Sequence, residues 1–292
     1  MKIVTFCSSS YDKTFRIGAL INHDEIVDLT SIVSNSDLTA AQILDCFDLE
    51  NDFFVRANDA ILAAGLPKIT RQNVVICAPV PRPGKIICIG LNYRNHAEES
   101  GMAIPTSPII FSKYSSCAIG SGEPIVIPAD STQTDYEAEL AVVIGRYARN
   151  VSRKNALSSV FGYTNLNDVS ARDFQFADGQ WQRGKSCDTF APMGEYISTA
   201  DEIADPQNLS IKFRLNGETL QDSTTSQMIF GVAELIEFLS RYVTLEPGDV
   251  IATGTPPGVG FARKPPVYLK AGDVAEVEIE GLGTLSNPVV TA

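Results

Sequence analysis

The first part of the chain alternates short apolar runs with polar turns. Three runs, at residues 2–7, 16–22 and 25–30, have the length and composition of β-strands. The residues between the last two runs, Asn22 to Glu25, predict a hairpin turn. Residues 37–64 then carry apolar side chains at helical spacing in two pieces, which predicts two helices.

A proline-rich segment divides this part from the rest of the chain. Residues 79–85, PVPRPGK, contain three prolines and one glycine, a composition typical of a linker. We therefore predict a small N-terminal α/β domain over residues 1–78 and a larger domain over residues 79–292.

The larger part is rich in predicted strands. Residues 85–93 indicate a strand that leads through a turn into a short helix around His96, and residues 231–243 indicate a helix whose apolar face includes Tyr242. Further strands are expected at residues 135–145, 161–168, 209–218, 249–255 and 273–281. Few strands alternate with helices, so the pattern favours a strand-rich α+β fold over a doubly wound parallel sheet.

Composition narrows the class of partner. The chain has 292 residues with a formal net charge of −12, which argues against a nucleic-acid surface, and it has no apolar run of membrane-spanning length. Six cysteines form no C-x-x-C pair, and the N-terminus resembles no secretory signal, so we expect reduced thiols and a cytoplasmic location. The expected partner is a small molecule.

Two histidines, His23 and His96, are too few for a three-histidine metal site, so any metal would need oxygen ligands. Glu137 and Glu139 lie two residues apart in a predicted strand, and their carboxylates should share one face. The alternative is a solvated strand face. We interpret the same spacing in this second way at Glu276, Glu278 and Glu280, on an expected edge strand.

Asp168 strengthens the metal interpretation of the first pair. It ends an apolar run, and Ser170 and Asp173 behind it have the spacing of a helix capping box, which places Asp168 at a strand-to-helix junction. Three carboxylates without histidine or cysteine suit Mg²⁺, Mn²⁺ or Ca²⁺ better than zinc.

Other candidates are less specific. His96 and Glu99 are spaced to meet on one helix, where a carboxylate can orient a histidine base, although a surface histidine is the common alternative. Lys185 and Gln175 are ordinary surface residues by composition alone. Thr255 stands in a rigid GTPPGVG turn that either contacts a ligand or only turns the chain.

Residues 179–186 fit the P-loop pattern G-x-x-x-x-G-K-[ST], but no buried strand precedes them. Pro192 and Gly194 follow too early for a helix, and the loop interior is bulky. We therefore reject nucleotide binding.

Six collinear motifs resemble the fumarylacetoacetate hydrolase family, in its group of proteins that act on 2-oxo acids. The resemblance covers residues 79–292. The motifs are GLNYRNHAEE, PIIFSK, DYEAELAVVIG, GYTNLNDVSARDFQ, RGKSCDTFAPMG and GDVIATGTPPGVG.

The resemblance implies a mixed β-sandwich roll, a homodimer and a 2-oxo acid substrate. It also implies roles for single residues. These are Mg²⁺ or Mn²⁺ ligands at Glu137, Glu139 and Asp168, a catalytic dyad at His96 and Glu99, a catalytic lysine at Lys185, and substrate contacts at Gln175 and Thr255.

The implied chemistry is cleavage of a C–C bond next to a 2-oxo acid through a metal-stabilised enolate. The expected reaction is hydrolysis of an acylpyruvate or a fumarylacetoacetate-like diketo acid. Oxaloacetate decarboxylation and the isomerisation or dehydration of a 2-oxo acid are alternatives within the family. The alternative that is not an enzyme is a family member without catalytic activity that binds a metabolite.

Overall fold

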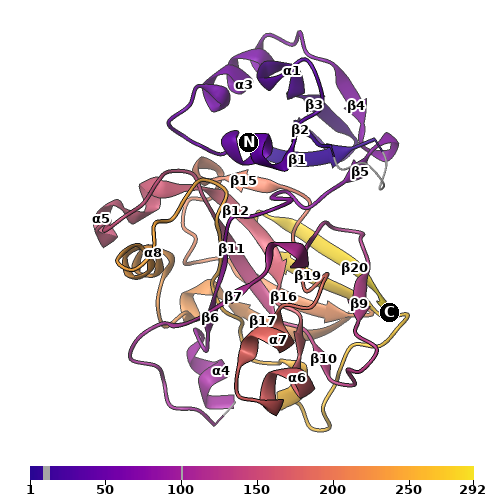
Figure 1. The fold of residues 1–292 in the computed structure, drawn as a ribbon, viewed down its shortest axis with the longest axis vertical. Coiled ribbons are helices and arrows are strands. Elements are labelled where there is room, and N and C mark those ends of the chain that lie inside the picture. Colours follow the sequence, from indigo (N-terminus) through magenta and orange to yellow (C-terminus); the bar gives the residue numbers. More distant parts are fainter. Residues whose placement is uncertain (9–13, 100) are drawn as a thin grey trace.

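The computed structural model describes residues 1–8, 14–99 and 101–292. Two β-sheets dominate these residues, and Figure 1 shows both in the body of the molecule with the N-terminal part above them. The helices are short and lie around the sheets, so the predicted strand-rich α+β class is confirmed.

The larger sheet has eleven strands among the described residues, and it runs from the N-terminal part through the body. Across the sheet its strands are β4 (Lys68–Thr70), β3 (Glu25–Asp28), β2 (Arg16–Leu20), β1 (Lys2–Cys7), β15 (Ile197–Thr199), β12 (Val160–Asn167), β11 (Ala138–Ile144), β18 (Val250–Ala252), β6 (Ile86–Gly90) and β7 (Ile109–Lys113), with β5 (Val75–Ile76) paired to β1.

The second sheet is formed by four strands of the C-terminal half and by β9 from the first half of the chain. Its order is β17 (Glu218–Thr224), β16 (Ser210–Leu215), β19 (Val274–Ile279), β20 (Gly283–Thr291) and β9 (Ile125–Ile127). Two small pairs accompany it, β10 (Thr134–Asp135) with β13 (Ser170–Ala171), and β14 (Ala191–Pro192) with β8 (Ala118–Ile119). The helices are α1 (Thr30–Val33), α2 (Ala40–Asp45), α3 (Phe53–Leu62), α4 (Arg94–Glu99), α5 (Arg153–Ala156), α6 (Arg172–Ala177), α7 (Trp181–Lys185) and α8 (Val232–Ser240).

Strand β11 is buried on both faces, which explains its nearly continuous apolar sequence. Its even-numbered residues, such as Leu140, share a core with Phe213 and Val277 of the second sheet. Its odd-numbered residues Ala141 and Val143 belong to a separate core that includes the N-terminal strands and helices. Strand β11 therefore lies between two hydrophobic cores, one on each of its faces.

The N-terminal part joins the body through main-chain pairing. Strand β1 pairs with β15, with Lys2 opposite Ser198, so the larger sheet continues across the expected domain boundary. The predicted hairpin between β2 and β3 and the two predicted helices α2 and α3 are confirmed. The division at residues 78 and 79 stays a prediction.

Two local expectations are wrong. Helix α8 ends at Ser240, so Tyr242 lies beyond it and is 65% exposed instead of facing the core. Strand β19 is not an edge strand, because it pairs with β16 on one side and β20 on the other. Its glutamates nevertheless lie on the less buried face of the strand, since Glu276 and Glu278 are half-buried and Glu280 is exposed.

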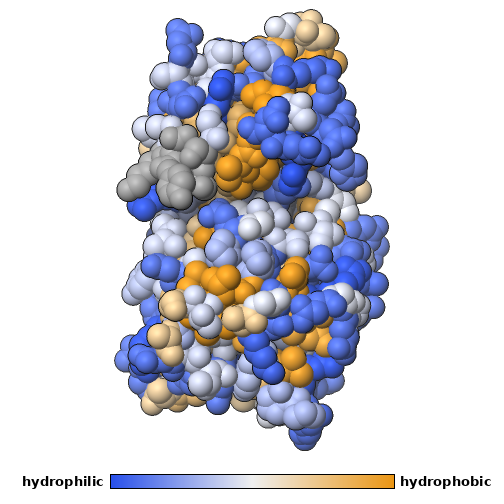
Figure 2. Space-filling view, turned by 90° about the vertical axis from the view of Figure 1, so that its right-hand side faces the viewer, coloured by the Kyte–Doolittle hydropathy of each residue, from blue (hydrophilic) through white to orange (hydrophobic). Residues whose placement is uncertain are grey.

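One face of the molecule is seen in Figure 2. Figure 2 shows hydrophobic side chains in separate patches, on both the N-terminal part and the body, among hydrophilic surface. Among the described residues, no helix has the length and apolar character that crossing a membrane requires.

Candidate active site

Antiparallel pairing brings the three predicted carboxylates together. Ala138 at the start of β11 pairs with Asn167 at the end of β12, so the residues just outside this pair, Glu137 and Asp168, are also opposite each other. The Asp168 N–H donates to the Glu137 carbonyl oxygen at 2.9 Å. Glu139 lies two residues along β11, and one carboxylate oxygen from each of the three residues lies within 4.8 Å of the others.

All three carboxylates are buried, so the interpretation of Glu137 and Glu139 as a solvated strand face is excluded. Burial raises the pKa of Glu139 well above its usual range, and the nearby charges of Asp168 and Glu137 raise it further. The cluster therefore has the electrostatics of a site that attracts a cation.

Two lysines lie against these carboxylates. The Lys185 Nζ is 2.8 Å from Glu137 Oε2 and 2.7 Å from Asp168 Oδ2, and the Lys113 Nζ is 2.6 Å from Asp168 Oδ1. The expectation from composition that Lys185 is a surface residue is wrong, because it ends α7 and only 2% of it is exposed. Burial opposes the charge on Lys185, yet Asp168 and Glu137 hold its pKa above the usual value.

Arg172, the first residue of α6, forms hydrogen bonds with the carboxylate cluster. Its guanidinium donates to Asp135 Oδ2 at 2.8 Å, to Glu137 Oε1 at 2.6 Å and to Gln175 Oε1 at 2.9 Å. Burial would raise the pKa of Glu137, but Lys185 and Arg172 outweigh it and hold that pKa below the usual range. Gln175 is buried, so its interpretation as a surface residue is wrong as well.

The predicted capping box is wrong, although the predicted junction between strand and helix is present. Helix α6 begins after Ala171, and no side chain caps it. Ser170 instead lies in β13 and donates to the Asp168 carbonyl oxygen, while the Asp173 carboxylate accepts from Ser131 and Thr132.

Sequence reasoning missed Lys113, Arg172 and Asp135 as members of the cluster. Lys113 and Arg172 lie inside the motifs PIIFSK and GYTNLNDVSARDFQ that carried the resemblance, and each is a cation with apolar residues near it in the sequence. A charged residue in such a position must be paired when it is buried, and this was the available signal.

His96 and Glu99 come together on α4 as their spacing predicts. The His96 Nδ1 is 3.4 Å from Glu99 Oε2, a long contact, and the Glu99 carboxylate also accepts from the Gly258 N–H at 3.0 Å. Glu99 therefore links the histidine to the loop that contains Thr255. A proton on Nδ1 would point toward Glu99 and would leave Nε2 free to accept a proton.

The loop after β18 passes very close to the carboxylate cluster. The Gly254 N–H donates to Glu139 Oε2 at 2.8 Å, and Gly254 has a positive φ of 99°. A side chain there would place its Cβ 2.6 Å from the Cβ of Asn92, so only glycine lets the loop approach. Thr255 follows directly and is buried at the site.

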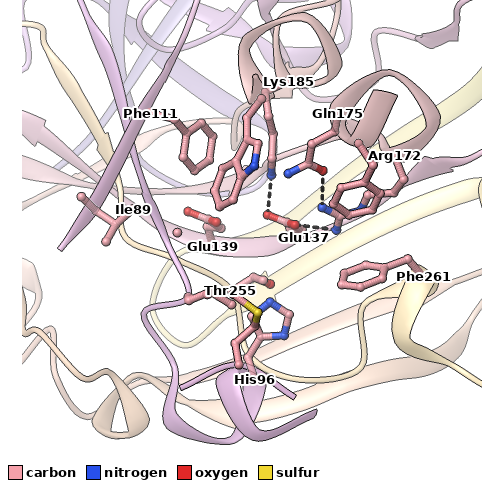
Figure 3. A pocket seen from close by; sticks show the side chains of 15 residues that line it. Ile89, His96, Phe111, Glu137, Glu139, Arg172, Gln175, Lys185, Thr255 and Phe261 are labelled. Atoms are coloured by element: carbon pink, nitrogen blue, oxygen red, sulfur yellow. Dashed lines mark hydrogen bonds and ion pairs between the residues drawn. The ribbon is translucent and has the colours of Figure 1, made fainter. Parts of the chain in front are cut away.

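These groups line one cavity of about 180 Å³. Figure 3 shows Lys185, Gln175 and Arg172 on one side of the carboxylates and His96 on the other, with Phe111 and Phe261 at the flanks. The described residues that line it are Ile89, Gly90, Leu91, His96, Met102, Phe111, Glu137, Glu139, Arg172, Gln175, Phe176, Trp181, Lys185, Thr255 and Phe261. Its size and apolar walls with a polar floor suit a small organic acid.

The donor set fits a divalent cation that prefers oxygen. Glu137, Glu139 and Asp168 supply carboxylate oxygens without a thiolate or imidazole among them. With Asp135, the buried acids outnumber the buried cations Lys113, Lys185 and Arg172 by one, and a bound divalent ion would reverse this excess. These residues could hold a divalent cation.

Residues 179–186, which fit the P-loop pattern, have a different conformation from a phosphate-binding loop. Helix α7 occupies Trp181–Lys185 inside the pattern, and the helix α6 precedes it instead of a strand. The lysine of the pattern, Lys185, points to the carboxylates.

Comparison with known proteins places these residues in a family. Residues 85–290 match the family model described as fumarylacetoacetate (FAA) hydrolase C-terminal. The mitochondrial oxaloacetate tautomerase Fahd2a of Rattus norvegicus is 50% identical over 230 residues, which cover 78% of this chain and 74% of that protein. The mitochondrial oxaloacetate tautomerase FAHD2A of Homo sapiens is 48% identical over 231 residues, with the same coverage of 78% and 74%.

Solved structures share the fold over the whole chain. A putative HpcE protein from Mycobacterium smegmatis has a TM-score of 0.85 and 37% identity, covering 100% of both chains. The maleylpyruvate hydrolase of Sphingobium sp. SYK-6, solved with manganese(II) and pyruvate, has a TM-score of 0.81 and 31% identity, also covering 100% of both chains.

The relatives contradict the expected cytoplasmic location. Those from rat, cattle and human are named mitochondrial proteins. The prediction rested on reduced cysteines together with an N-terminus that resembles no secretory signal, and neither feature distinguishes the cytoplasm from mitochondria. The cytoplasmic prediction is wrong.

The match extends from β6 to β20 and includes every residue of the carboxylate cluster, the His96–Glu99 pair and Lys185. The relatives and structural neighbours include tautomerases, hydrolases and isomerases, so the match is to a family of enzymes. This chain belongs to the fumarylacetoacetate hydrolase family.

Proposed function

We propose that this protein is a Mg²⁺- or Mn²⁺-dependent tautomerase that interconverts the keto and enol forms of oxaloacetate or a closely similar 2-oxo dicarboxylate. The observation that carries the proposal is the buried group of Glu137, Glu139 and Asp168 with Lys185 beside it and His96 across the cavity. Relatives about half identical to this chain, named oxaloacetate tautomerases, support this choice of reaction.

Tautomerisation needs a proton carrier near C3 of the acid and positive charge near its C2 oxygen. Mg²⁺ or Mn²⁺, when bound, would supply Lewis-acid stabilisation of developing negative charge. In the keto-to-enol direction His96 would take the proton from C3 through Nε2 and deliver it to the C2 oxygen, because Glu99 engages Nδ1. The reverse direction moves the proton back to C3. The Gln175 Oε1 accepts from Arg172, which leaves its amide nitrogen to donate to the substrate.

Hydrolysis of a C–C bond next to a 2-oxo acid is the second candidate. It is the reaction that the motifs of the sequence imply, and the structural similarity to a maleylpyruvate hydrolase favours it. The two reactions would share the charge stabilisation and differ in whether His96 acts on substrate carbon or on water.

One experiment separates these candidates. Purified protein is mixed with oxaloacetate and Mg²⁺, and the ultraviolet absorbance of the enol is followed while pyruvate is measured by a coupled dehydrogenase. Accelerated enol–keto equilibration without faster pyruvate release, abolished by a chelator, is the expected result. Release of pyruvate from oxaloacetate would instead indicate decarboxylation, and release from an acylpyruvate without tautomerisation would indicate hydrolysis.

A further inference from the structure

Gln221 lies behind the wall of the cavity and connects its two sides. It belongs to β17, is 1% exposed, and is not among the described residues that line the cavity. Its Nε2 donates to Thr255 Oγ1 at 2.9 Å and to the Pro256 carbonyl oxygen at 2.8 Å. Its Oε1 accepts from the Ala138 N–H at 3.0 Å, between the carboxylate residues Glu137 and Glu139.

These partners allow only one orientation of the Gln221 amide. The Pro256 carbonyl oxygen can only accept, and the Ala138 N–H can only donate. Rotating the amide by half a turn would put acceptor against acceptor and donor against donor in a buried place, which is costly. The nitrogen therefore faces Thr255, and the Thr255 hydroxyl oxygen accepts a hydrogen bond from it.

This contact determines what Thr255 offers to a ligand. A threonine hydroxyl has one hydrogen, and because its oxygen already accepts from Gln221, that hydrogen is available for the cavity that Thr255 lines. The hydroxyl is thus set as a donor. An acceptor group of a ligand opposite it can take this hydrogen, and a carboxylate is the strongest acceptor that a 2-oxo acid contains.

We propose that Gln221 is a positioning residue that acts through Thr255 and makes its hydroxyl a donor to a carboxylate of the substrate. This inference rests on the proposed function, which supplies the 2-oxo acid. Such a bond to a carboxylate exists in the ground state and in the transition state alike, so its loss should raise KM and leave kcat nearly unchanged.

The test is a double-mutant cycle with Gln221→Met, Thr255→Val and the combined variant. Each single change should raise KM for oxaloacetate by about tenfold to a hundredfold, the usual worth of a hydrogen bond to a charged group. If Gln221 acts through Thr255, adding Q221M to T255V should raise KM no further. Oxalate affinity, measured by calorimetry with Mg²⁺ present, should follow the same pattern without turnover.

Two controls separate positioning from general stability. Thr255→Ser keeps the hydroxyl and should retain a KM near that of the wild type. Gln207 is another bridging glutamine, which accepts from the Val232 N–H and donates to the Thr225 carbonyl oxygen, and neither partner is among the described residues that line the cavity. Gln207→Met should lower the free energy of unfolding and leave KM unchanged.

A second variant tests the proposal if Q221M does not fold. Gln221→Glu keeps the acceptor for Ala138 but places an oxygen opposite Thr255, so the Thr255 hydrogen would turn to residue 221. KM should rise in Q221E and should not rise further when Q221E is added to T255V, whereas an effect of charge alone would persist in that background.

The inference would be overturned if the KM increase in a combined variant equalled the product of the increases in the two single variants. An unchanged KM in Q221M and Q221E would overturn it as well. Failure of the proposed function has a different appearance: the wild type would bind oxalate without tautomerising oxaloacetate. In that case the double-mutant cycle of Gln221 and Thr255 would be evaluated from the oxalate affinities of the variants instead of KM.

Discussion

Two strands of this protein carry glutamates at the same spacing and use them in opposite ways. On β11 and just before it, Glu139 and Glu137 are buried and converge with Asp168. On β19, Glu276 and Glu278 alternate with buried apolar residues and remain half-buried. The motif E-x-E is therefore not by itself a metal site.

The difference comes from what covers each strand. Strand β11 lies inside the larger sheet with a packed core on both faces, so the glutamates on it and just before it are buried at the cavity and must find partners. Strand β19 has one face on the core, and Glu278 pairs with Arg214 on the neighbouring strand at 2.6 Å. A buried pair of like charges attracts a cation, because water does not screen the two charges. A more exposed pair is screened by solvent and needs no bound cation.

The largest expected effect is on β11. Glu139→Gln removes one charged ligand from the cluster and should weaken Mn²⁺ binding by more than about a hundredfold, because even changes around metal ligands cost ten- to a hundredfold. Calorimetry with Mn²⁺ measures the affinity, and tautomerisation should be lost with it. Glu278→Gln is the matched control on β19 and should change neither. Equal Mn²⁺ affinity in E139Q and the wild type would remove Glu139 from the ligand set.

A change at His96 distinguishes metal binding by the carboxylates from proton transfer to and from the substrate. His96→Ala should lower kcat for tautomerisation by ~10²–10⁴-fold, the usual loss of a general base, while Mn²⁺ affinity stays close to that of the wild type. His23, an exposed histidine in the turn between β2 and β3, gives the control variant His23→Ala, which should keep full activity. Full activity in H96A would assign the proton transfer to another group.

Metal removal should destabilise the protein through the carboxylate cluster of Glu137, Glu139 and Asp168. A ligand that binds only the folded state at about a hundred times its Kd adds about 2.7 kcal/mol to the free energy of unfolding. The melting temperature of the wild type in Mn²⁺ should therefore fall when a chelator is added. E139Q should show almost no such change, and E278Q should respond as the wild type does. A similar fall in E139Q would mean that the stabilising ion binds elsewhere.

Much of this comparison could be predicted from the sequence. The alternation along residues 135–145 correctly placed Leu140 and its even-numbered neighbours on a face opposite the glutamates, and a carboxylate after a strand correctly placed Asp168 at a junction. The pattern also correctly indicated that the face with Glu276 and Glu278 is the more exposed one.

What the sequence could not predict depends on pairing between distant segments. Strand β19 forms a local hairpin with β20, but its other neighbour is β16, a distant segment of the chain, so it is not the edge strand expected. Lys185 and Gln175 are surface residues by type, and only the packing of α6 and α7 beside the carboxylates buries them. Arg172 and Lys113 were missed because a buried cation is recognised by its partners, which sequence spacing does not reveal.

The smallest expected effect is the loss of the β19 ion pair. The Arg214 Nη1 is 2.6 Å from Glu278 Oε2, but both side chains are partly exposed, at 25% and 42%. Solvent and salt screen such pairs, so Glu278→Gln should lower the free energy of unfolding by about 0.2–1 kcal/mol. Urea unfolding at low and high salt measures this, and the difference from the wild type should shrink as salt increases. A loss several times larger that does not depend on salt would mean that Glu278 is held as tightly as Glu137. The contrast between the two strands would then rest on Asp168, the third carboxylate, and no longer on burial.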